Sequence, residues 1–319
     1  MGYGAWKKSD FADYSRRMKR EVGKDGRITG SYTNQEMFKS KRLDPLLDPR
    51  NVVRECCDSE QHPETLPVIL ALDVTGSMGQ AAVEVAKELN VIMTRLYDET
   101  PDVQFMVMGI GDFAYDACPL QVSQFEADIR IAEQLDKLYF EFGGGGNNFE
   151  SYTAAWYFAL HHTRLDAWKR GKKGILITMG DERLNPYIPC LGKYIAFEDV
   201  TGDRVQGDIE TKELYSEVTK KYEIYHLNVE HRHGYDAEGI RTSWKEYLDK
   251  KHFRDVTVNG IAGEIVDIIK AVKNCRGTEK GCRGTEKGWT GTMPGMTEAA
   301  GGTGRHVSFL KRMAEGISW

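Results

Sequence analysis

Short apolar runs alternate with amphipathic segments through the middle of the chain. The apolar runs have the length of buried strands, and they predict strands near 67–73, 103–110, 118–122, 174–180, 222–228 and 253–258. Helical spacing of apolar residues predicts helices near 80–97, 128–139, 149–170, 211–221, 241–251 and 260–273. This alternation predicts an α/β fold, doubly wound, with a mainly parallel six-stranded sheet that helices cover on both faces.

The third strand is expected to run against the others. Only the turn 111–117 separates it from the second strand, and so short a connection permits an antiparallel hairpin but no parallel crossover. The sheet should therefore contain one antiparallel edge strand.

The segment before this core, residues 1–63, is a basic arm with one expected helix near Asp10–Val22. Residues 1–54 carry 13 Lys or Arg and 7 Asp or Glu, a balance of +6; the whole chain has a net charge of −5, so the remainder sums to −11. A basic arm can fold back on the acidic body, bind an acidic partner or touch nucleic acid. We favour the first interpretation, because no nucleic-acid-binding motif supports the last.

Beyond the expected core, 64–273, the composition changes again. The heptad Cys275–Gly281 is repeated at once as Cys282–Gly288, and its glycine, threonine and charged residues predict a flexible linker over 274–304. The last segment, 305–319, spaces its apolar residues as a short amphipathic helix does. Such a helix can dock on the core or on a partner.

Two features bear on the cellular compartment. No apolar run approaches the ~20 residues that a membrane-spanning helix needs, and the first residues lack the apolar stretch of a secretory signal. The six cysteines include no Cys-x-x-Cys pair, which favours reduced thiols. These features predict a cytoplasmic protein that does not contact a membrane, and its compact form fits a bacterial or phage source.

The most informative motif follows the first expected strand. Asp73-Val74-Thr75-Gly76-Ser77 ends an apolar run, and it offers one carboxylate and two hydroxyls, the hard oxygen ligands that Mg²⁺ and Mn²⁺ prefer. Gly76 lets the loop curl so that these side chains converge. An Asp or Thr at this position can instead cap the following helix without binding a metal, and this alternative stays open.

The motif resembles the metal-ion-dependent adhesion site (MIDAS) of the von Willebrand factor A (vWA) family, whose signature is Asp-x-Ser/Thr-x-Ser. Its form Asp-x-Thr-Gly-Ser-Met is most similar to intracellular bacterial and protist members, including the vWA domain attached to some alpha-kinases. The resemblance spans roughly residues 64–272. Three later segments resemble further motifs of that subgroup in the same order: 109–116, 143–151 and 175–181.

The resemblance implies a Rossmann-like sheet with strand order 3-2-1-4-5-6, in which the carboxyl end of the central first strand is the topological switch point. It implies that the two hydroxyls ligate Mg²⁺ or Mn²⁺. Asp73 and the later Asp181 either hold metal-bound water or ligate the metal directly when no partner is present. The usual third-loop Thr is absent, and Asn147 or Asn148 is the candidate in its place. The expected metal site therefore comprises Asp73, Thr75, Ser77, Asn147, Asn148 and Asp181.

Other polar residues near these motifs are interpreted structurally. Asp112 and Asp116 are expected to be turn residues. Glu150 could ligate through water, but we favour a place in the first turn of a helix, where the helix dipole stabilises an acid. The glycines 143–146 form either a flexible turn or a loop that lets an ion approach.

Three histidines, His226, His231 and His233, follow the fifth expected strand. Their spacing could bind a transition metal. A solvated polar loop is the favoured interpretation.

In the vWA family the open metal position accepts a carboxylate from a partner protein. The resemblance therefore implies a non-enzymatic adaptor or scaffold that captures an Asp or Glu of a protein partner, such as an AAA+ ATPase or a multiprotein complex; nucleic acid is not expected. The sequence contains no Gly-x-Ser-x-Gly, Walker A, His-Glu-x-x-His or protein-kinase motif. Two alternatives stay open: a metal-dependent phosphohydrolase, and a structural subunit that assembles through its arm and tail.

Overall fold

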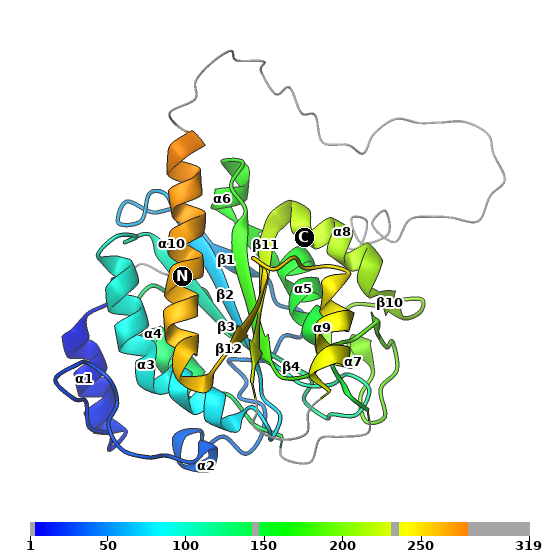
Figure 1. Cartoon of the computed structure of the whole chain (residues 1–319), viewed down its shortest axis with the longest axis horizontal. Coiled ribbons are helices and arrows are strands. Elements are labelled where there is room, and N and C mark those ends of the chain that lie inside the picture. Colours follow the sequence, from blue (N-terminus) through cyan, green and yellow to red (C-terminus); the bar gives the residue numbers. More distant parts are fainter. Residues whose placement is uncertain (1–3, 142–146, 231–235, 280–319) are drawn as a thin grey trace. The chain divides into compact units, whose positions relative to one another are not determined.

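Six strands form a sheet at the centre of the fold: β2 (Leu66–Asp73), β3 (Val103–Ile110), β4 (Leu120–Val122), β7 (Gly174–Gly180), β11 (Tyr222–Val229) and β12 (Phe253–Val256). Their spatial order is β12-β11-β7-β2-β3-β4 (Figure 1). Every neighbouring pair is parallel except β3 and β4, which are antiparallel. Counted along the chain, this is the order 3-2-1-4-5-6 that the resemblance implies. The predicted α/β fold, doubly wound with one antiparallel edge strand, is therefore confirmed.

The computed structural model describes residues 4–141, 147–230 and 236–279. The chain divides into two units, residues 1–275 and 276–319, and the account below concerns the first. The linker predicted beyond residue 279 and the helix predicted over 305–319 lie outside the described residues.

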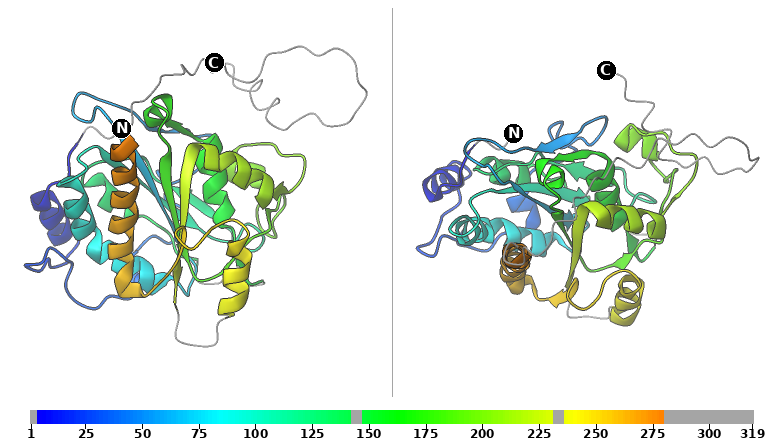
Figure 2. Two further views of the ribbon diagram at one scale, coloured as in Figure 1. Left: turned by 45° about the horizontal axis from the view of Figure 1, so that its top comes forward. Right: turned by 90° about the horizontal axis from the view of Figure 1, so that it is seen from above.

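Helices cover both faces of the sheet (Figure 1 and Figure 2). One face carries α3 (Gly79–Tyr97), α4 (Arg130–Leu135) and α10 (Ile261–Glu279), and the other carries α5 (Tyr152–His161), α8 (Thr211–Lys221) and α9 (Ala237–Lys245). The shorter elements are α1 (Lys8–Arg17), α2 (Asn34–Met37), β1 (Arg54–Cys56), β5 (Phe149–Glu150), β6 (Thr163–Leu165), α6 (Asp166–Lys169), β8 (Arg183–Leu184), β9 (Tyr187–Ile188), α7 (Phe197–Thr201), β10 (Ile209–Glu210) and η1 (Val258–Gly260).

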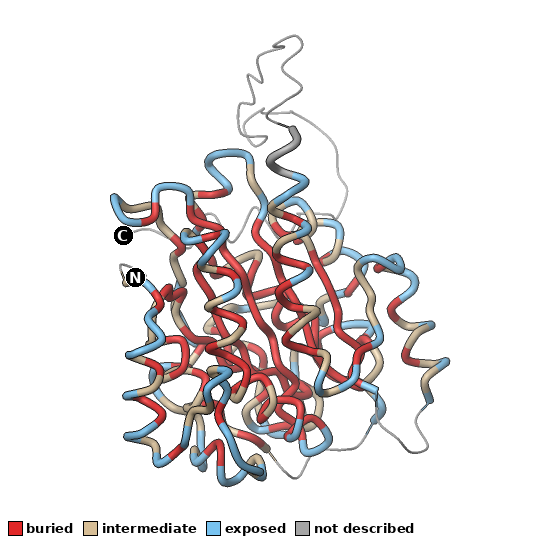
Figure 3. Tube along the Cα trace, turned by 60° about the vertical axis from the view of Figure 1, so that its left-hand side comes forward, coloured by how far each residue is buried: buried red, intermediate tan, exposed pale blue. Residues whose placement is uncertain are grey.

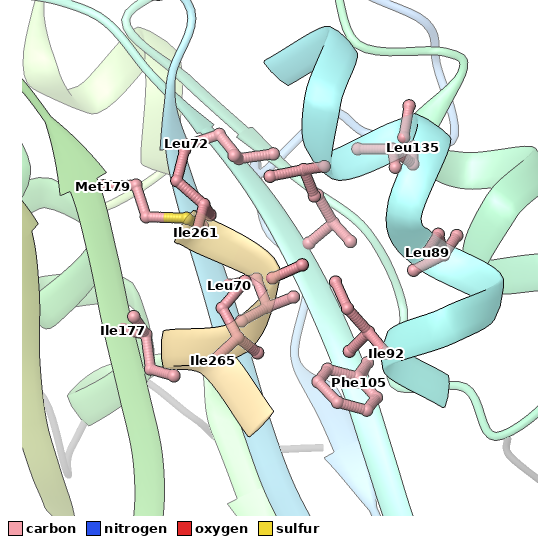
Figure 4. Close-up of a cluster of buried hydrophobic side chains, with 14 of the residues drawn as sticks. Leu70, Leu72, Leu89, Ile92, Phe105, Leu135, Ile177, Met179, Ile261 and Ile265 are labelled. Carbon is pink, nitrogen blue, oxygen red and sulfur yellow. The ribbon is translucent and has the colours of Figure 1, made fainter. Parts of the chain in front are cut away.

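The core lies between the central strands and the helices on either side. All eight residues of β2 are buried, as expected for a parallel strand that is covered on both faces. Its alternate residues Leu70 and Leu72 pack with Ile177, Ile261 and Ile265 in one cluster (Figure 4). Figure 3 shows the same pattern over the whole fold, with buried residues along the strands and on the inward faces of the helices. The end of β2 is therefore held by packing from all sides.

The single helix predicted over 149–170 is divided in the structure into α5 and α6, with the strand β6 between them. The helix α5 ends at His161, and the chain then becomes extended as β6. Strand β6 pairs in parallel with β1, a segment of the arm about a hundred residues earlier in the chain. This pairing satisfies the backbone groups of 163–165 outside a helix. The last helix, α10, is longer than predicted: it continues to Glu279, beyond the expected end at residue 273.

The described part of the N-terminal arm packs on the helices of the first face. Trp6, Phe11, Tyr14 and Met37 belong to the same buried cluster as the side chains of β2 and α3. The indole of Trp6 donates a hydrogen bond to the Asn90 side chain at 3.0 Å. The arm thus folds back on the body of the protein, which is the interpretation that its charge balance favoured.

A buried ion pair fastens the arm to α4. The guanidinium of Arg20 donates to both carboxylate oxygens of Asp136, at 3.0 and 2.7 Å, and to the carbonyl oxygen of Met37 at 2.6 Å. The hydroxyl of Tyr14 also donates to this carboxylate, at 2.7 Å. Burial nevertheless raises the pKa of Asp136, because desolvation outweighs the attraction of Arg20.

Two observations concern the compartment. No helix in the described ranges is long and apolar enough to cross a membrane. The cysteines of the described ranges are free thiols: Cys56, Cys57, Cys118, Cys190 and Cys275. The cytoplasmic location stays a prediction.

We expect Asp136→Ala to lower the free energy of unfolding by about 3–5 kcal/mol, because it leaves the Arg20 guanidinium buried without its counter-charge. Urea unfolding followed by circular dichroism measures this loss. Asp13→Ala is the control, since the pair of Asp13 with Arg16 is exposed and should be worth less than about 1 kcal/mol. Equal losses of stability in the two variants would contradict the role of the ion pair in holding the arm. The double variant Arg20→Met with Asp136→Leu removes both charges and should recover most of the stability that Asp136→Ala loses.

Candidate metal centre

The candidate site lies at the carboxyl ends of two neighbouring central strands. Asp73 is the last residue of β2, and Asp181 directly follows β7, which pairs in parallel with β2. Parallel strands end at the same edge of a sheet, so the two carboxylates are brought close by topology alone. The chain leaves β2 toward β3 on one side and reaches β7 on the other. This is the switch point at which open α/β sheets bind ligands.

Four of the predicted site residues lie in one hydrogen-bonded group. The hydroxyl of Thr75 lies 3.4 Å from that of Ser77, and the Ser77 hydroxyl donates to Oδ1 of Asp181 at 3.1 Å. The backbone N–H and the hydroxyl of Thr75 both donate to Oδ1 of Asp73, at 2.8 and 2.6 Å. Each hydroxyl is thus oriented by one of the two carboxylates.

The alternative of simple helix capping is wrong for these residues. Helix α3 begins at Gly79, and its N-cap residue, Met78, makes no side-chain cap hydrogen bond. Asp73 instead accepts from the hydroxyl of Thr75, and the Ser77 hydroxyl donates to Asp181. The motif therefore builds a polar centre rather than a helix start.

Asp73 is fully buried, and all of its hydrogen-bond donors are neutral. Besides Thr75, the hydroxyl of Tyr152 donates to its Oδ2 at 3.2 Å. Burial and the neighbouring charge of Asp181 raise the pKa of Asp73 to about 7. A carboxylate in this setting is costly unless a cation compensates it.

Sequence reasoning missed Tyr152, although it contacts the centre directly. It begins α5, and its ring packs so closely on Gly180 that a Cβ at that glycine would collide with the hydroxyl. The same hydroxyl accepts a hydrogen bond from the backbone N–H of Glu182 at 3.3 Å. The sequence carries no sign of this role, because a tyrosine at a helix start is most simply interpreted as core.

The two asparagines do not join the hydroxyl pair. The amide of Asn147 donates to Oδ2 of Asp112 at 2.9 Å, and its carbonyl oxygen accepts from the backbone N–H of Phe149 at 3.0 Å. Asn148 is exposed. The glycines 143–146 before them lie outside the described residues. The structure thus brings together Asp73, Thr75, Ser77 and Asp181, and it places Asn147 against Asp112.

Asp112 and Asp116 hold their own turn, as the sequence predicts. Asp112 accepts from the backbone N–H of Ala114 at 2.9 Å, and Asp116 accepts from the N–H of Asp112 at 2.7 Å. Asp112 also lies 3.3 Å from the hydroxyl of Ser151, which ties this turn to the start of α5.

Glu150 differs from its prediction. It lies in the short strand β5, before α5 begins, and β5 pairs with β8 just after Asp181. It is only 9% exposed, and within the described part of the chain its Oε2 has no hydrogen-bond partner. Burial and the charge of Asp73 raise its pKa well above the ordinary value. The favoured place in the first helical turn is therefore wrong.

His226 is not part of a solvated loop. Its ring is fully buried and stacks on Trp244 with centroids 3.7 Å apart, and its Nδ1 lies 2.9 Å from the hydroxyl of Thr178. Burial lowers its pKa well below the ordinary value. His231 and His233 lie outside the described residues.

The donor set fits Mg²⁺ or Mn²⁺ better than zinc. Two hydroxyls and two carboxylates are hard oxygen donors. Among the residues that the structure describes, no three His, Cys, Asp or Glu side chains converge as a ready metal cage. A cation here would therefore rely on the hydroxyls of Thr75 and Ser77 and on water. The fully buried Asp73, with neutral donors only, is the observation that fits such a cation.

No protein-family model matches the chain, and no curated protein matches it. Among solved structures, it is similar to the pilus adhesin SpaC from Lactobacillus rhamnosus GG in an open conformation, at 15% identity and a TM-score of 0.46, over 68% of this chain and 31% of SpaC. It is also similar to the vWF domain of the type V pili tip protein Mfa5 from Porphyromonas gingivalis, at 11% identity and a TM-score of 0.41, over 66% of this chain and 96% of that one. The chain thus matches about a third of the length of SpaC.

We expect Asp73→Asn to raise the melting temperature of the metal-free protein by a few degrees at pH 8, because it removes a buried charge and keeps the acceptor for Thr75. The pKa of Asp73 near 7 lies above the unfolded value near 4. The folded wild type therefore binds a proton that the unfolded chain lacks, and its metal-free stability should fall as the pH rises from about 4 to 7.

Melting curves in EDTA at pH 5 and pH 8, repeated in Mg²⁺ and Mn²⁺, test both halves of this prediction. Wild type should gain stability with metal at pH 8, whereas Asp73→Asn should not respond to metal. Asp13→Asn, an exposed carboxylate, should behave as wild type. A variant that melts lower than wild type in EDTA at pH 8 would contradict the prediction.

Proposed function

We propose that this chain is a metal-dependent protein-binding module of the vWA type, in which a MIDAS-bound Mg²⁺ or Mn²⁺ captures a carboxylate of a protein partner. One observation supports it above the others. At the switch point of the sheet, the hydroxyls of Thr75 and Ser77 lie 3.4 Å apart, and each is held by a carboxylate that follows a central strand.

The hydroxyl and carboxyl groups of the centre would have different roles in binding the cation. Thr75 and Ser77 would offer neutral hydroxyl oxygens, while Asp73 and Asp181 orient those hydroxyls and supply negative charge close by. Mg²⁺ gives up its waters reluctantly and keeps part of its shell as water. A site with few direct anionic ligands leaves such a cation attractive to an incoming carboxylate.

The rim beside the centre offers apolar contact area to a partner. Leu191 and Tyr194 are 75% and 63% exposed, and they flank Lys193, whose backbone N–H donates to the carbonyl of Ala114 at 2.8 Å. Ala114 belongs to the turn that Asp112 closes. A partner that presents an Asp or Glu next to an apolar side chain would match both features. A component of a multiprotein complex, such as an AAA+ ATPase, is the kind of partner that the resemblance suggests.

Binding, rather than hydrolysis, is the function that we propose for this centre. A phosphohydrolase would need a general base that reaches a bound water or substrate. His226 is enclosed by aromatic rings and bonded to Thr178, so its imidazole is part of the core. The sequence also contains no Gly-x-Ser-x-Gly, Walker A or His-Glu-x-x-His motif.

We expect the Mg²⁺-loaded protein to bind peptides that contain a single Asp or Glu on an array in which that residue and its neighbours are varied. Binding should disappear in EDTA, should be absent for the matching Asn or Gln peptides, and should weaken at least about tenfold in Ser77→Ala. Ser216→Ala removes an exposed hydroxyl on α8 and serves as the matched control.

Carboxylate binding that survives both EDTA and Ser77→Ala would refute the proposal. So would Mg²⁺-dependent turnover of phosphate esters that is lost in Ser77→Ala, since it would place a reaction at this centre.

A further inference from the structure

Glu150 is a buried carboxyl group for which the described residues provide neither a partner for Oε2 nor a counter-charge among the charges that act on it most strongly. The side chain is 9% exposed, and its Oε2 is fully enclosed without a hydrogen-bond partner in the ranges that the structure describes. A buried carboxylate oxygen left without a partner costs stability. Such a group is retained at this cost where it binds something that the polypeptide itself does not supply.

The strand β5 places Glu150 beside the segment that follows Asp181. Glu150 is paired in register with Leu184, three residues after Asp181, and Tyr152, two residues after Glu150, bonds Asp73. The charges that act most strongly on Glu150 are those of Asp73, Asp116 and Asp112, and all of them are negative. A divalent cation is the ligand that such a setting calls for.

The asparagines of the same loop are engaged elsewhere or face solvent. Both ends of the Asn147 amide are used, one by Asp112 and the other by the backbone of Phe149. Asn148 is exposed. Glu150 is therefore the described residue of this loop whose side chain is buried with a carboxyl oxygen that has no hydrogen-bond partner.

We infer that Glu150, rather than Asn147 or Asn148, is the group with which the third loop holds the divalent cation. The inference rests on the metal centre of the proposed function and specifies it further. A carboxylate from the third loop raises the affinity of the centre for the metal before any partner arrives. It also partly neutralises the cation, so that a partner carboxylate must compete with an internal one.

Titration with Mn²⁺, followed by the electron paramagnetic resonance signal of the free ion, tests this inference. Glu150→Gln keeps the size of the side chain and removes the charge, and it should weaken Mn²⁺ binding about 10- to 100-fold. Asn147→Ala and Asn148→Ala should bind Mn²⁺ as wild type does. Glu182→Gln removes a neighbouring carboxylate that acts on Glu150 and should change the affinity less than about threefold.

Melting curves in EDTA separate metal binding from a structural role. A merely structural Glu150 would change the melting temperature of the metal-free protein but not the affinity for Mn²⁺, and this outcome would overturn the inference. An affinity lost in Asn148→Ala and kept in Glu150→Gln would overturn it as well. If Glu150→Gln does not fold, Glu150→Asp, which keeps the charge but shortens its reach, should show the same selective loss.

Failure of the inference and failure of the proposed function give different results. If wild type binds no Mn²⁺, or if Ser77→Ala binds it equally well, the metal centre itself is refuted, and the inference falls with it. If Ser77→Ala loses Mn²⁺ and Glu150→Gln keeps it, the metal centre stands and only the role of Glu150 is refuted.

Discussion

The buried carboxylate of Asp73 is the constraint on which the rest of this structure depends. It ends the most central strand of the sheet, where all eight residues of β2 are removed from water. The donors around it, from Thr75 and Tyr152, are neutral. Such donors offset part of the cost of burying a charge but do not cancel it. The burial of the ionised Asp73 carboxylate at this edge of the sheet therefore remains only partly compensated.

A second buried carboxyl group, that of Asp136, differs from Asp73 because it has a cationic partner. Asp136 accepts hydrogen bonds from one guanidinium nitrogen of Arg20 and from the hydroxyl of Tyr14. That pair lies between the arm and α4, and the polypeptide itself provides its counter-charge. Asp73 and Glu150 have no such partner among their described contacts. The carboxyl group that fastens the arm is paired within the chain, whereas the described residues give Asp73 and Glu150 no cationic partner.

The packing that surrounds the switch point makes the centre rigid. Helices cover both faces of β2 (Figure 1). The buried cluster around Leu70 and Leu72 packs on the strand up to the residue before Asp73 (Figure 4). The Tyr152 ring fills the space over Gly180 and ties α5 to both carboxyl-terminal loops. Groups held in this way meet a ligand without first being ordered, which favours binding.

The sequence by itself determined the features that depend on neighbours along the chain. Strand and helix periodicity predicted the sheet, and Asp73, Thr75 and Ser77 lie within one loop whose hydrogen bonds span two residues. Only the tertiary structure decided that Tyr152 bonds Asp73, that Glu150 pairs with Leu184, and that Asn147 bonds Asp112. It also decided that His226 is buried and that β6 leaves the predicted helix to pair with β1. These features depend on contacts between segments that lie tens of residues apart in the chain. Such contacts follow from the packing of the whole chain and produce no periodic pattern in the local sequence.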